Sequence, residues 1–159
     1  MYRTKSGGLI NRKKVLNFSF NGKNLKGFDG DTLSSALLGN GIHLVGRSFK
    51  YHRPRGIFTS GSEEPSALVQ LDEKKFTEPN IRATTVKLFD GLVSNSQNHV
   101  GSLSWDFMRI NDYLSTFLSA GFYYKTFMWP KAFWEKIYEP IIRNAAGLGK
   151  LSKESDPSI

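Results

Sequence analysis

The hydrophobic pattern near the start of the chain predicts a β-hairpin. Residues 15–20 alternate apolar and polar side chains with a period of two, which is typical of a half-buried strand. The Asn21-Gly22 pair follows directly, and this dipeptide favours the two-residue turn of a hairpin. We therefore expect residues 23–28 to form the returning strand.

A short helix is expected next. Apolar side chains recur at helical spacing within residues 33–38, and Asp31 or Thr32 stands where a helix cap belongs. Gly39 then favours the end of the helix. A hairpin followed by a short helix across its face is how a β-grasp domain begins, so we expect this α+β fold over residues 11–100.

The middle of the chain predicts two more strands separated by polar loops. Residues 67–71 alternate again, and residues 82–88 also favour a strand. Residues 42–66 are rich in turn-forming and charged residues, and residues 92–104 are polar, so we expect loops in both segments. Residues 72–75 are expected to form a turn.

Aromatic side chains crowd residues 101–144, for which we expect a helical extension. Phe107, Ile110 and Leu114 share one helical face, and Pro130 suits the first turn of a second helix. A local core would use some of these side chains. Their number exceeds what a small domain needs, so we favour a docking surface for a larger body. The candidate interface residues are Phe127, Trp129, Phe133 and Trp134.

Composition excludes several classes of protein. The chain has 159 residues, which suits one main domain with its own core. Cysteine is absent, so the chain has no disulfide, cysteine–zinc site or cysteine-ligated iron–sulfur cluster. No apolar run reaches the roughly 18 residues of a membrane span, and the first residues lack the apolar middle of a signal peptide. We therefore expect a cytoplasmic protein without a membrane partner.

Positive charge is concentrated in the first third of the chain. Residues 1–55 contain 11 Lys and Arg against two Asp and Glu, whereas the whole chain has 22 and 14. The densest group lies within residues 46–56 and is interleaved with aromatic side chains. Such a group either grips a dinucleotide phosphate or an acidic protein face, or it ties down the chain's own carbonyls and carboxylates. Both alternatives stay open for Arg47, Lys50, His52, Arg53 and Arg55.

Side chains for catalysis are sparse. The histidines are His43, His52 and His99, and none stands at metal-ligand spacing with another. The sequence has no nucleophile elbow, phosphate-binding loop or dinucleotide fingerprint. The adjacent carboxylates of Glu63 and Glu64 are expected to be a solvated pair. We therefore predict no catalytic residue and no metal site in this chain.

Five strings carry a resemblance to a known family. They are Gly30-Asp-Thr-Leu-Ser-Ser-Ala-Leu-Leu38, Arg47-Ser-Phe-Lys-Tyr-His-Arg-Pro-Arg-Gly56, Gly61-Ser-Glu-Glu-Pro65, Asn80-Ile-Arg-Ala-Thr-Thr85 and Gly121-Phe-Tyr-Tyr-Lys-Thr-Phe-Met-Trp-Pro130. Together they resemble the amino-terminal segment of the α subunit of heterotetrameric sarcosine oxidase. The resemblance runs from about Leu9 to about Gly149, which is most of the chain.

The resemblance implies a much longer subunit. A ferredoxin-like amino-terminal domain is followed in the family by a dinucleotide-binding region that holds NAD and by a folate-associated domain. The complex with the β, γ and δ subunits also implies FAD, FMN and tetrahydrofolate. It oxidises sarcosine to glycine, passes the one-carbon unit to tetrahydrofolate and forms hydrogen peroxide. From their residues we expect positions 1–10 to form a loose leader and positions 145–159 to form a linker. The resemblance implies that this linker leads toward a dinucleotide-binding domain outside this chain.

The resemblance also explains the absence of cysteine. Related amino-acid dehydrogenase subunits hold a [2Fe–2S] cluster in this domain, with the spacing Cys-x4-Cys-x2-Cys and a fourth Cys further on. By comparison with them, the ligand positions fall at Thr59, Glu64, Ala67 and Thr84, none of which supplies a thiolate. We therefore expect no cofactor in this chain and a structural, non-catalytic role.

Two further expectations concern partners. Arg47, Lys50, Arg53 and Arg55 are candidates for contact with a dinucleotide or a neighbouring domain. The alternative function is a free-standing basic module that binds nucleic acid or protein. Nucleic acid is not the expected partner, because no stacking motif of the RNA-binding type is present.

Overall fold

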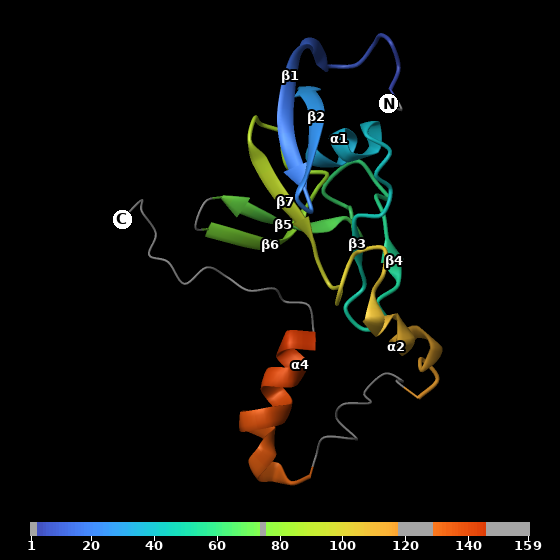
Figure 1. Ribbon diagram of the computed structural model, residues 1–159, viewed down its shortest axis with the longest axis vertical. Helices are drawn as coiled ribbons and strands as arrows, with labels where there is room; N and C mark the ends of the chain where they lie inside the picture. The colour runs from blue at the N-terminus through green and yellow to red at the C-terminus, as the bar shows by residue number, and fades with distance from the viewer. Residues whose placement is uncertain (1–2, 74–75, 118–128, 146–159) are drawn as a thin grey trace.

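The computed structural model describes residues 3–73, 76–117 and 129–145. They contain a five-stranded mixed sheet with the strand order β2-β1-β7-β5-β6 (Figure 1). β1 pairs with β7 in parallel, and the other neighbouring pairs are antiparallel. The strands are β1 (Asn11–Phe20), β2 (Lys23–Asp29), β5 (Leu68–Glu73), β6 (Phe76–Arg82) and β7 (Leu92–Ser96).

The predicted hairpin is confirmed. β1 and β2 pair antiparallel, with Phe20 opposite Lys23. Asn21 and Gly22 have φ values of 50° and 74°, and the type I′ turn of a two-residue hairpin requires positive φ at both central positions. β1 begins earlier than the alternation indicated, because residues 11–14 continue the strand across an irregular register.

The predicted helix is also confirmed, as α1 (Leu33–Gly39). Its cap is Thr32, whose hydroxyl accepts a hydrogen bond from the N–H of Ser35 at 3.2 Å. The Ser35 hydroxyl accepts the N–H of Thr32 in return at 3.0 Å, which completes a capping box. Gly27 in β2 allows the close approach of this helix, since a Cβ there would lie 3.1 Å from that of Ala36.

The hydrophobic core lies between α1 and the inner face of the sheet. β1 contributes alternate side chains to it, as the two-residue period predicted, and α1 contributes one stripe. The buried apolar residues are Leu16, Phe18, Phe20, Leu25, Leu33, Ala36, Leu37, Val45, Ala67, Val69, Ala83, Leu88 and Leu92.

The loop predicted over residues 92–104 is wrong in its first part. Residues 92–96 form β7, which pairs with both β1 and β5 and therefore lies in the middle of the sheet. The pattern concealed this strand because two of its three buried positions, Ser94 and Ser96, are serines. The Ser94 hydroxyl donates to the carbonyl oxygen of Ser19 at 2.9 Å, which satisfies it inside the protein.

The strand predicted over residues 82–88 is wrong in position. β6 ends at Arg82, and the following residues form turns and a single bridge from Lys87. The sequence of β6 does not indicate a strand, because it contains Pro79 and Asn80. Proline has no N–H to donate to a neighbouring strand, and Asn80 has a φ of 61°. They are tolerated since β6 lies at the edge of the sheet.

The segment predicted as one long loop contains a small second sheet. β3 (Gly46–Arg47) and β4 (Pro54–Arg55) pair antiparallel. Residues 47–55, which include the end of β3 and all of β4, are here called the basic loop. The N–H of His52 donates to the carbonyl oxygen of Ser48 at 3.0 Å, and His52 has a φ of 53°, so the loop is tightly turned.

Short helices follow the sheet, in the segment for which a helical extension was predicted. Pro130 stands immediately before the second group of helices, and Pro140 lies in the first turn of the last one, where proline is tolerated. The elements are η1 (Phe107–Arg109), α2 (Ile110–Tyr113), η2 (Lys131–Phe133), the π-helix η3 (Trp134–Tyr138) and α4 (Glu139–Ala145).

The architecture is therefore the α+β, β-grasp arrangement that the sequence predicted. In the described residues a hairpin, a crossing helix, three further strands of the main sheet and the small β3–β4 sheet form the domain, and short helices follow it along the chain. Within the described ranges no helix is both long enough and apolar enough to cross a bilayer.

Candidate functional site

Residues 58–67, here called the cluster loop, contain three of the four predicted ligand positions. β5 begins directly after this loop. The fourth position, Thr84, lies in the turn after β6, and its hydroxyl donates to the carbonyl oxygen of Gly61 at 2.6 Å. The structure therefore brings together Thr59, Glu64, Ala67 and Thr84 around a single loop.

The carboxylate of Glu64 is enclosed by the backbone of the cluster loop. Its Oε2 accepts the N–H of Phe58 at 2.8 Å and that of Thr59 at 2.6 Å. Its Oε1 accepts the N–H of Ser66 at 2.7 Å and that of Ala67 at 3.0 Å. Glu64 is only 1% exposed, so these four N–H groups replace the water that a carboxylate ordinarily binds.

The electrostatic environment keeps Glu64 charged. Burial would raise the pKa of this carboxyl, but the hydrogen bonds from the surrounding backbone N–H groups outweigh burial and hold the pKa below its usual value. The predicted solvated pair is therefore wrong for Glu64, although Glu63 is exposed. Adjacent loop residues point in different directions, and only the family resemblance, which puts Glu64 at a ligand position, distinguished the two carboxylates in the sequence.

The guanidinium of Arg47, in the basic loop, is bound by the chain itself. Its Nε donates to the carbonyl oxygen of Leu103 at 2.8 Å, and Nη1 donates to that of His52 at 2.7 Å. Its Nη2 donates to the carbonyl oxygen of Ser104 at 3.3 Å. Arg47 is buried, so in this structure it connects the basic loop to the segment that follows the sheet. This matches the second of the two alternatives that the sequence left open.

Asp106 lies in the same connection and is also buried. Its Oδ2 accepts a hydrogen bond from Nδ1–H of His52 at 2.6 Å, and Nε of Arg47 lies 3.6 Å away. Its Oδ1 accepts the N–H of Val100 at 3.0 Å and that of Met108 at 3.1 Å. Burial would raise the pKa of Asp106, but these hydrogen bonds, with the Coulomb attraction of His52, hold it below the usual value.

The other basic side chains of this loop are more exposed. Arg53 forms an ion pair with Asp112 of α2, in which Nε lies 2.6 Å from Oδ1. The cationic groups of Arg53 and Lys50 lie 4.8 Å and 4.9 Å from the ring centre of Tyr51. Arg55 is exposed in β4. Contact of Arg47, Lys50, Arg53 or Arg55 with a dinucleotide stays a prediction.

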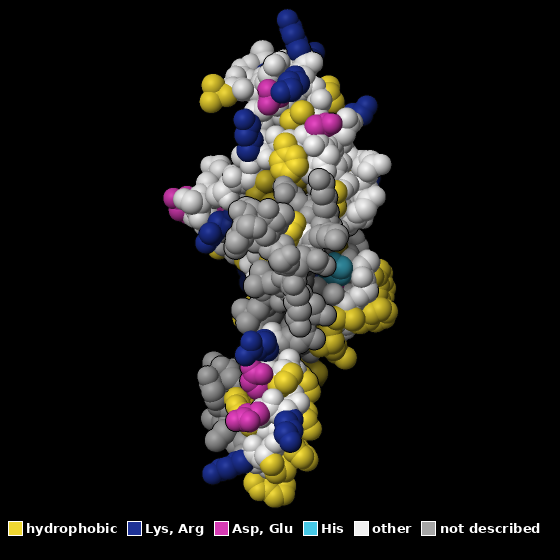
Figure 2. Space-filling model, turned by 90° about the vertical axis from the view of Figure 1, so that its left-hand side faces the viewer, with side chains coloured by type: hydrophobic (Ala, Val, Ile, Leu, Met, Phe, Trp, Pro, Cys, Tyr) yellow, Lys and Arg dark blue, Asp and Glu magenta, His cyan; other side chains and the backbone are white. Residues whose placement is uncertain are grey.

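Large apolar side chains are exposed along the predicted docking extension. Trp129 is 82% exposed and Phe133 is 45% exposed, while Trp134 is partly buried; Phe127 lies outside the described residues. Figure 2 shows hydrophobic side chains gathered in the lower half of the molecule, where these helices lie. Other exposed members of the segment are Trp105, Phe107, Met108, Ile110, Tyr113, Leu114, Phe117, Ile137 and Ile141.

Comparison with protein families identifies the domain. Residues 13–99 match the family described as the 2Fe-2S iron-sulfur cluster binding domain. The chain belongs to this family. The matched range covers most of the hairpin, α1, the cluster loop and β7.

Three curated relatives are all sarcosine oxidase α subunits. The chain is 58% identical to "Sarcosine oxidase subunit alpha" of Rhizobium meliloti (strain 1021) over 98% of its own length, and it spans 16% of that relative. It is 40% identical to the subunits of the same name from Corynebacterium sp. strains U-96 and P-1. These matches cover 62% and 59% of this chain and 10% of each relative. The resemblance to the sarcosine oxidase α subunit is thus confirmed.

A solved structure is also similar. The crystal structure of L-proline dehydrogenase from P. horikoshii matches 55% of this chain and 16% of its own, with 29% identity and a TM-score of 0.45.

The residues of this 2Fe-2S family member do not fit a [2Fe–2S] cluster. Such a cluster is held by four cysteine thiolates in the ferredoxins, and this chain has no cysteine. Ala67 has no donor atom in its side chain, and the Thr84 hydroxyl donates its hydrogen to the backbone at Gly61. The Glu64 carboxylate already accepts hydrogen bonds from four backbone N–H groups. No group of three potential metal ligands was found in the described part of the chain.

Sequence reasoning missed two of the residues that organise this 2Fe-2S family domain. Asp106 was not singled out, because its side-chain partners, His52 and Arg47, are far away in the sequence. Arg3 lies in the predicted leader, yet it donates two hydrogen bonds to Asp31. The aromatic residues around Asp106 marked the segment but gave no sign of the buried carboxylate.

Proposed function

We propose that this chain is the structural, non-catalytic amino-terminal portion of the α subunit of a heterotetrameric sarcosine oxidase. The observation that carries the proposal is its 58% identity to such a subunit over 98% of the chain. The chain spans only a small part of that relative, so the chemistry belongs to the rest of the complex.

In this proposal the complex oxidises the N-methyl group of sarcosine, yields glycine and reduces dioxygen to hydrogen peroxide. The one-carbon unit passes to tetrahydrofolate. The other parts of the complex hold NAD, FAD, FMN and tetrahydrofolate, and include the remainder of α and the β, γ and δ subunits. A cytoplasmic location belongs to the same proposal.

The lack of a cluster supports the non-catalytic part of the proposal. An iron–sulfur domain carries electrons only through its cluster, and the four positions here hold Thr59, Glu64, Ala67 and Thr84. What the domain retains is its β-grasp fold and, in the described part of residues 101–144, a set of exposed apolar side chains. We assign to the extension the docking of this chain on the rest of the complex, with Trp129, Phe133, Trp134 and Phe127 as anchors and residues 145–159 as the linker.

Purification of the complex through a tag on this chain tests the assignment. The expected result is co-purification of the remaining subunits with sarcosine-dependent formation of hydrogen peroxide. A chain that purifies without partners, or a complex that forms no peroxide from sarcosine, would contradict the proposal.

The docking role has its own test. Changing Trp129 and Trp134 to Ala together should weaken association with the remainder of the α subunit by well over about 1 kcal/mol, because buried tryptophans often anchor interfaces. Leu9→Ala is the matched control, since Leu9 is 98% exposed and lies outside the extension. Unchanged affinity of the double variant with an intact circular dichroism spectrum would reject this role.

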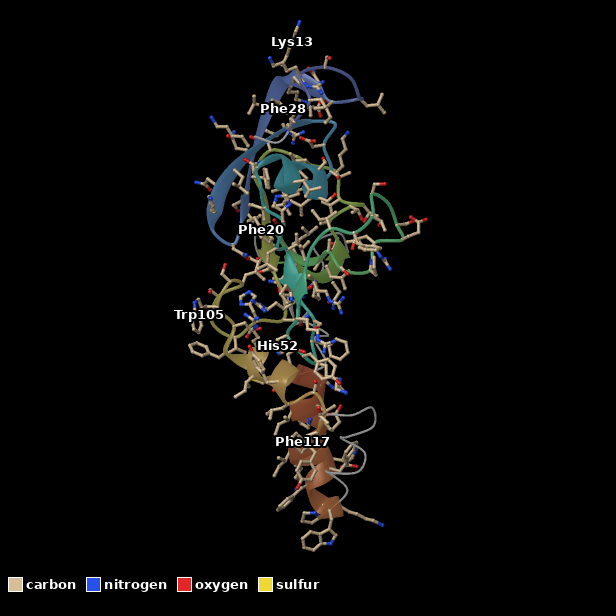
Figure 3. All side chains as sticks on the ribbon, turned by 90° about the vertical axis from the view of Figure 1, so that its right-hand side faces the viewer. Lys13, Phe20, Phe28, His52, Trp105 and Phe117 are labelled. Carbon is tan, nitrogen blue, oxygen red and sulfur yellow. The ribbon has the colours of Figure 1, made fainter. Side chains whose placement is uncertain are left out.

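The alternative, a nucleic-acid-binding module, requires basic and aromatic side chains on one shared surface. The exposed Lys13 of the hairpin lies at the top of the described molecule in Figure 3, whereas the exposed Phe117 of the extension lies in its lower half. Binding to random oligonucleotides that weakens steeply with salt would favour the alternative.

A further inference from the structure

The cluster loop is a built binding site for an anion. Four backbone N–H groups converge on the Glu64 carboxylate, two on each oxygen. The Thr59 hydroxyl also donates to Oε2, at 3.4 Å. Within the described residues no Lys or Arg side chain forms an ion pair with this carboxylate, so neutral hydrogen-bond donors, most of them backbone N–H groups, balance its charge. This is the geometry of a backbone anion nest, with the anion supplied by the chain itself.

The loop is held in shape by contacts that do not use this carboxylate. The carbonyl oxygen of Gly61 accepts both the Thr84 hydroxyl and the N–H of Glu64. The carbonyl oxygen of Ala67 accepts the N–H of Ala83 at 2.9 Å, and that of Glu64 accepts Nε–H of Arg82 at 3.2 Å. The N–H groups are therefore positioned by the neighbouring turn as well as by the anion.

The shape of the site selects a small carboxylate. Two N–H groups serve each of two oxygens, which fits a planar anion with two oxygens. Glu64 is almost fully buried, so there is little room for a larger tetrahedral anion. Truncation of Glu64 to Ala removes two carbons and two oxygens, which are the heavy atoms of acetate.

We propose that the cluster loop is a carboxylate-binding site which Glu64 occupies permanently, in the place where relatives hold a metal cluster. An iron–sulfur cluster and a carboxylate make the same demand on a loop, because both are anionic acceptors of N–H hydrogen bonds. Glu64 thus organises the loop without metal. This inference rests on the loop geometry and on the match to the 2Fe-2S family, and it does not depend on the proposed function.

Acetate should rescue a truncated variant of the full chain. Glu64→Ala is expected to melt at a lower temperature than the wild-type chain, and sodium acetate should restore at least half of that loss with a saturable dose dependence. Sodium chloride at the same ionic strength should not. The amide NMR signals of Phe58, Thr59, Ser66 and Ala67 should shift together with acetate. A response no larger than that to chloride overturns the proposal.

Two controls make the result specific. Glu63→Ala removes the neighbouring exposed carboxylate, and its melting temperature should respond to acetate no more than to chloride. Glu64→Gln fills the site with an amide, so it should be destabilised and unresponsive. An acetate response in either control equal to that of Glu64→Ala overturns the proposal.

A variant too unstable to purify folded still gives a decision. Glu64→Ala would then be refolded from denaturant in acetate and, separately, in chloride. Cooperative unfolding regained only in acetate supports the site, and its absence in both solutions counts against the site.

Discussion

At the scale of single residues, Arg3 shows how a side chain can fix a segment that lacks regular structure. Its Nη1 and Nη2 donate to the two oxygens of Asp31 at 2.9 Å and 2.7 Å. Asp31 also accepts the N–H of Phe28 and the hydroxyl of Ser35. Burial would raise the pKa of Asp31, but the hydrogen bonds from Arg3, Ser35 and Phe28 outweigh it and leave the pKa lowered.

We predict that Arg3→Ala lowers the free energy of unfolding at pH 7 by about 1–3 kcal/mol, because the buried Asp31 loses its counterion. Urea unfolding measures the effect. Lys5→Ala is the control, since Lys5 is exposed, and it should change stability by less than about 0.5 kcal/mol.

The same pair predicts a dependence on pH. The folded pKa of Asp31 is lowered, so its stabilisation is present above the unfolded pKa of about 3.9 and is lost as the pH falls through the folded value. The difference between the wild-type chain and Arg3→Ala should therefore shrink below about pH 4. An equal difference at neutral and strongly acidic pH would show that the ion pair is not its source.

The pattern of polar and apolar residues could not reveal which polar side chains are buried. Glu63 and Glu64 are chemically identical neighbours, yet one is exposed and the other is enclosed by N–H groups. The distinction arises from the path of the cluster loop, which depends on contacts with the distant turn at Thr84. The family resemblance indicated the four ligand positions. Only the structure shows that the Glu64 carboxylate accepts hydrogen bonds from the N–H groups of the cluster loop.

At the scale of elements, Asp106 connects the β-grasp domain to the extension. It caps η1 through the N–H of Met108 and also binds His52 of the basic loop. In Figure 3 the labelled His52 and Trp105 lie where the basic loop meets the start of the extension. Because one carboxylate serves both elements, its loss should loosen their connection, although Arg47 and the Arg53–Asp112 pair still join them.

We predict that Asp106→Ala lowers the free energy of unfolding by about 3 kcal/mol, since it leaves buried donors without an acceptor. Hydrogen exchange should accelerate across residues 97–113 more than in the sheet. Asp112→Ala is the control, because its ion pair with Arg53 is largely exposed, and it should cost at most about 1 kcal/mol. A uniform acceleration over the whole domain would argue against a local joint.

Elements set by local signals were predictable, and those set by distant contacts were not. The first hairpin carries its turn residues at Asn21-Gly22, and α1 carries its own cap, so both were found. β7 lies between β1 and β5, and it buries serines whose hydroxyls are satisfied by those neighbours or their turns. Its place in the sheet depends on partners far away in the sequence, which an alternation pattern cannot register.

At the scale of the whole molecule, the fold should still accept the metal cluster when its ligands are restored. We predict that combining Thr59→Cys, Glu64→Cys, Ala67→Cys and Thr84→Cys allows reconstitution with iron and sulfide, to about two iron atoms per chain. Iron analysis and the electron paramagnetic resonance of the reduced protein measure the result.

The control for this experiment keeps Glu64 and changes the other three positions to Cys. It should bind far less iron, because the carboxylate still occupies the N–H groups of the cluster loop. Equal iron in the two variants would mean that Glu64 does not stand in the place of the cluster. No iron in the fourfold variant would mean that the scaffold has diverged too far.

The use of a carboxylate in place of thiolates in the cluster loop affects how well the domain resists oxidation. Thiolates and the iron they hold are vulnerable to oxidants, whereas a carboxylate is not. In the proposed complex, peroxide is released by neighbouring subunits throughout turnover. A supporting domain whose cluster loop is organised by Glu64 needs neither iron nor sulfide to mature. Its cluster loop also contains no sulfur atom that hydrogen peroxide could oxidise.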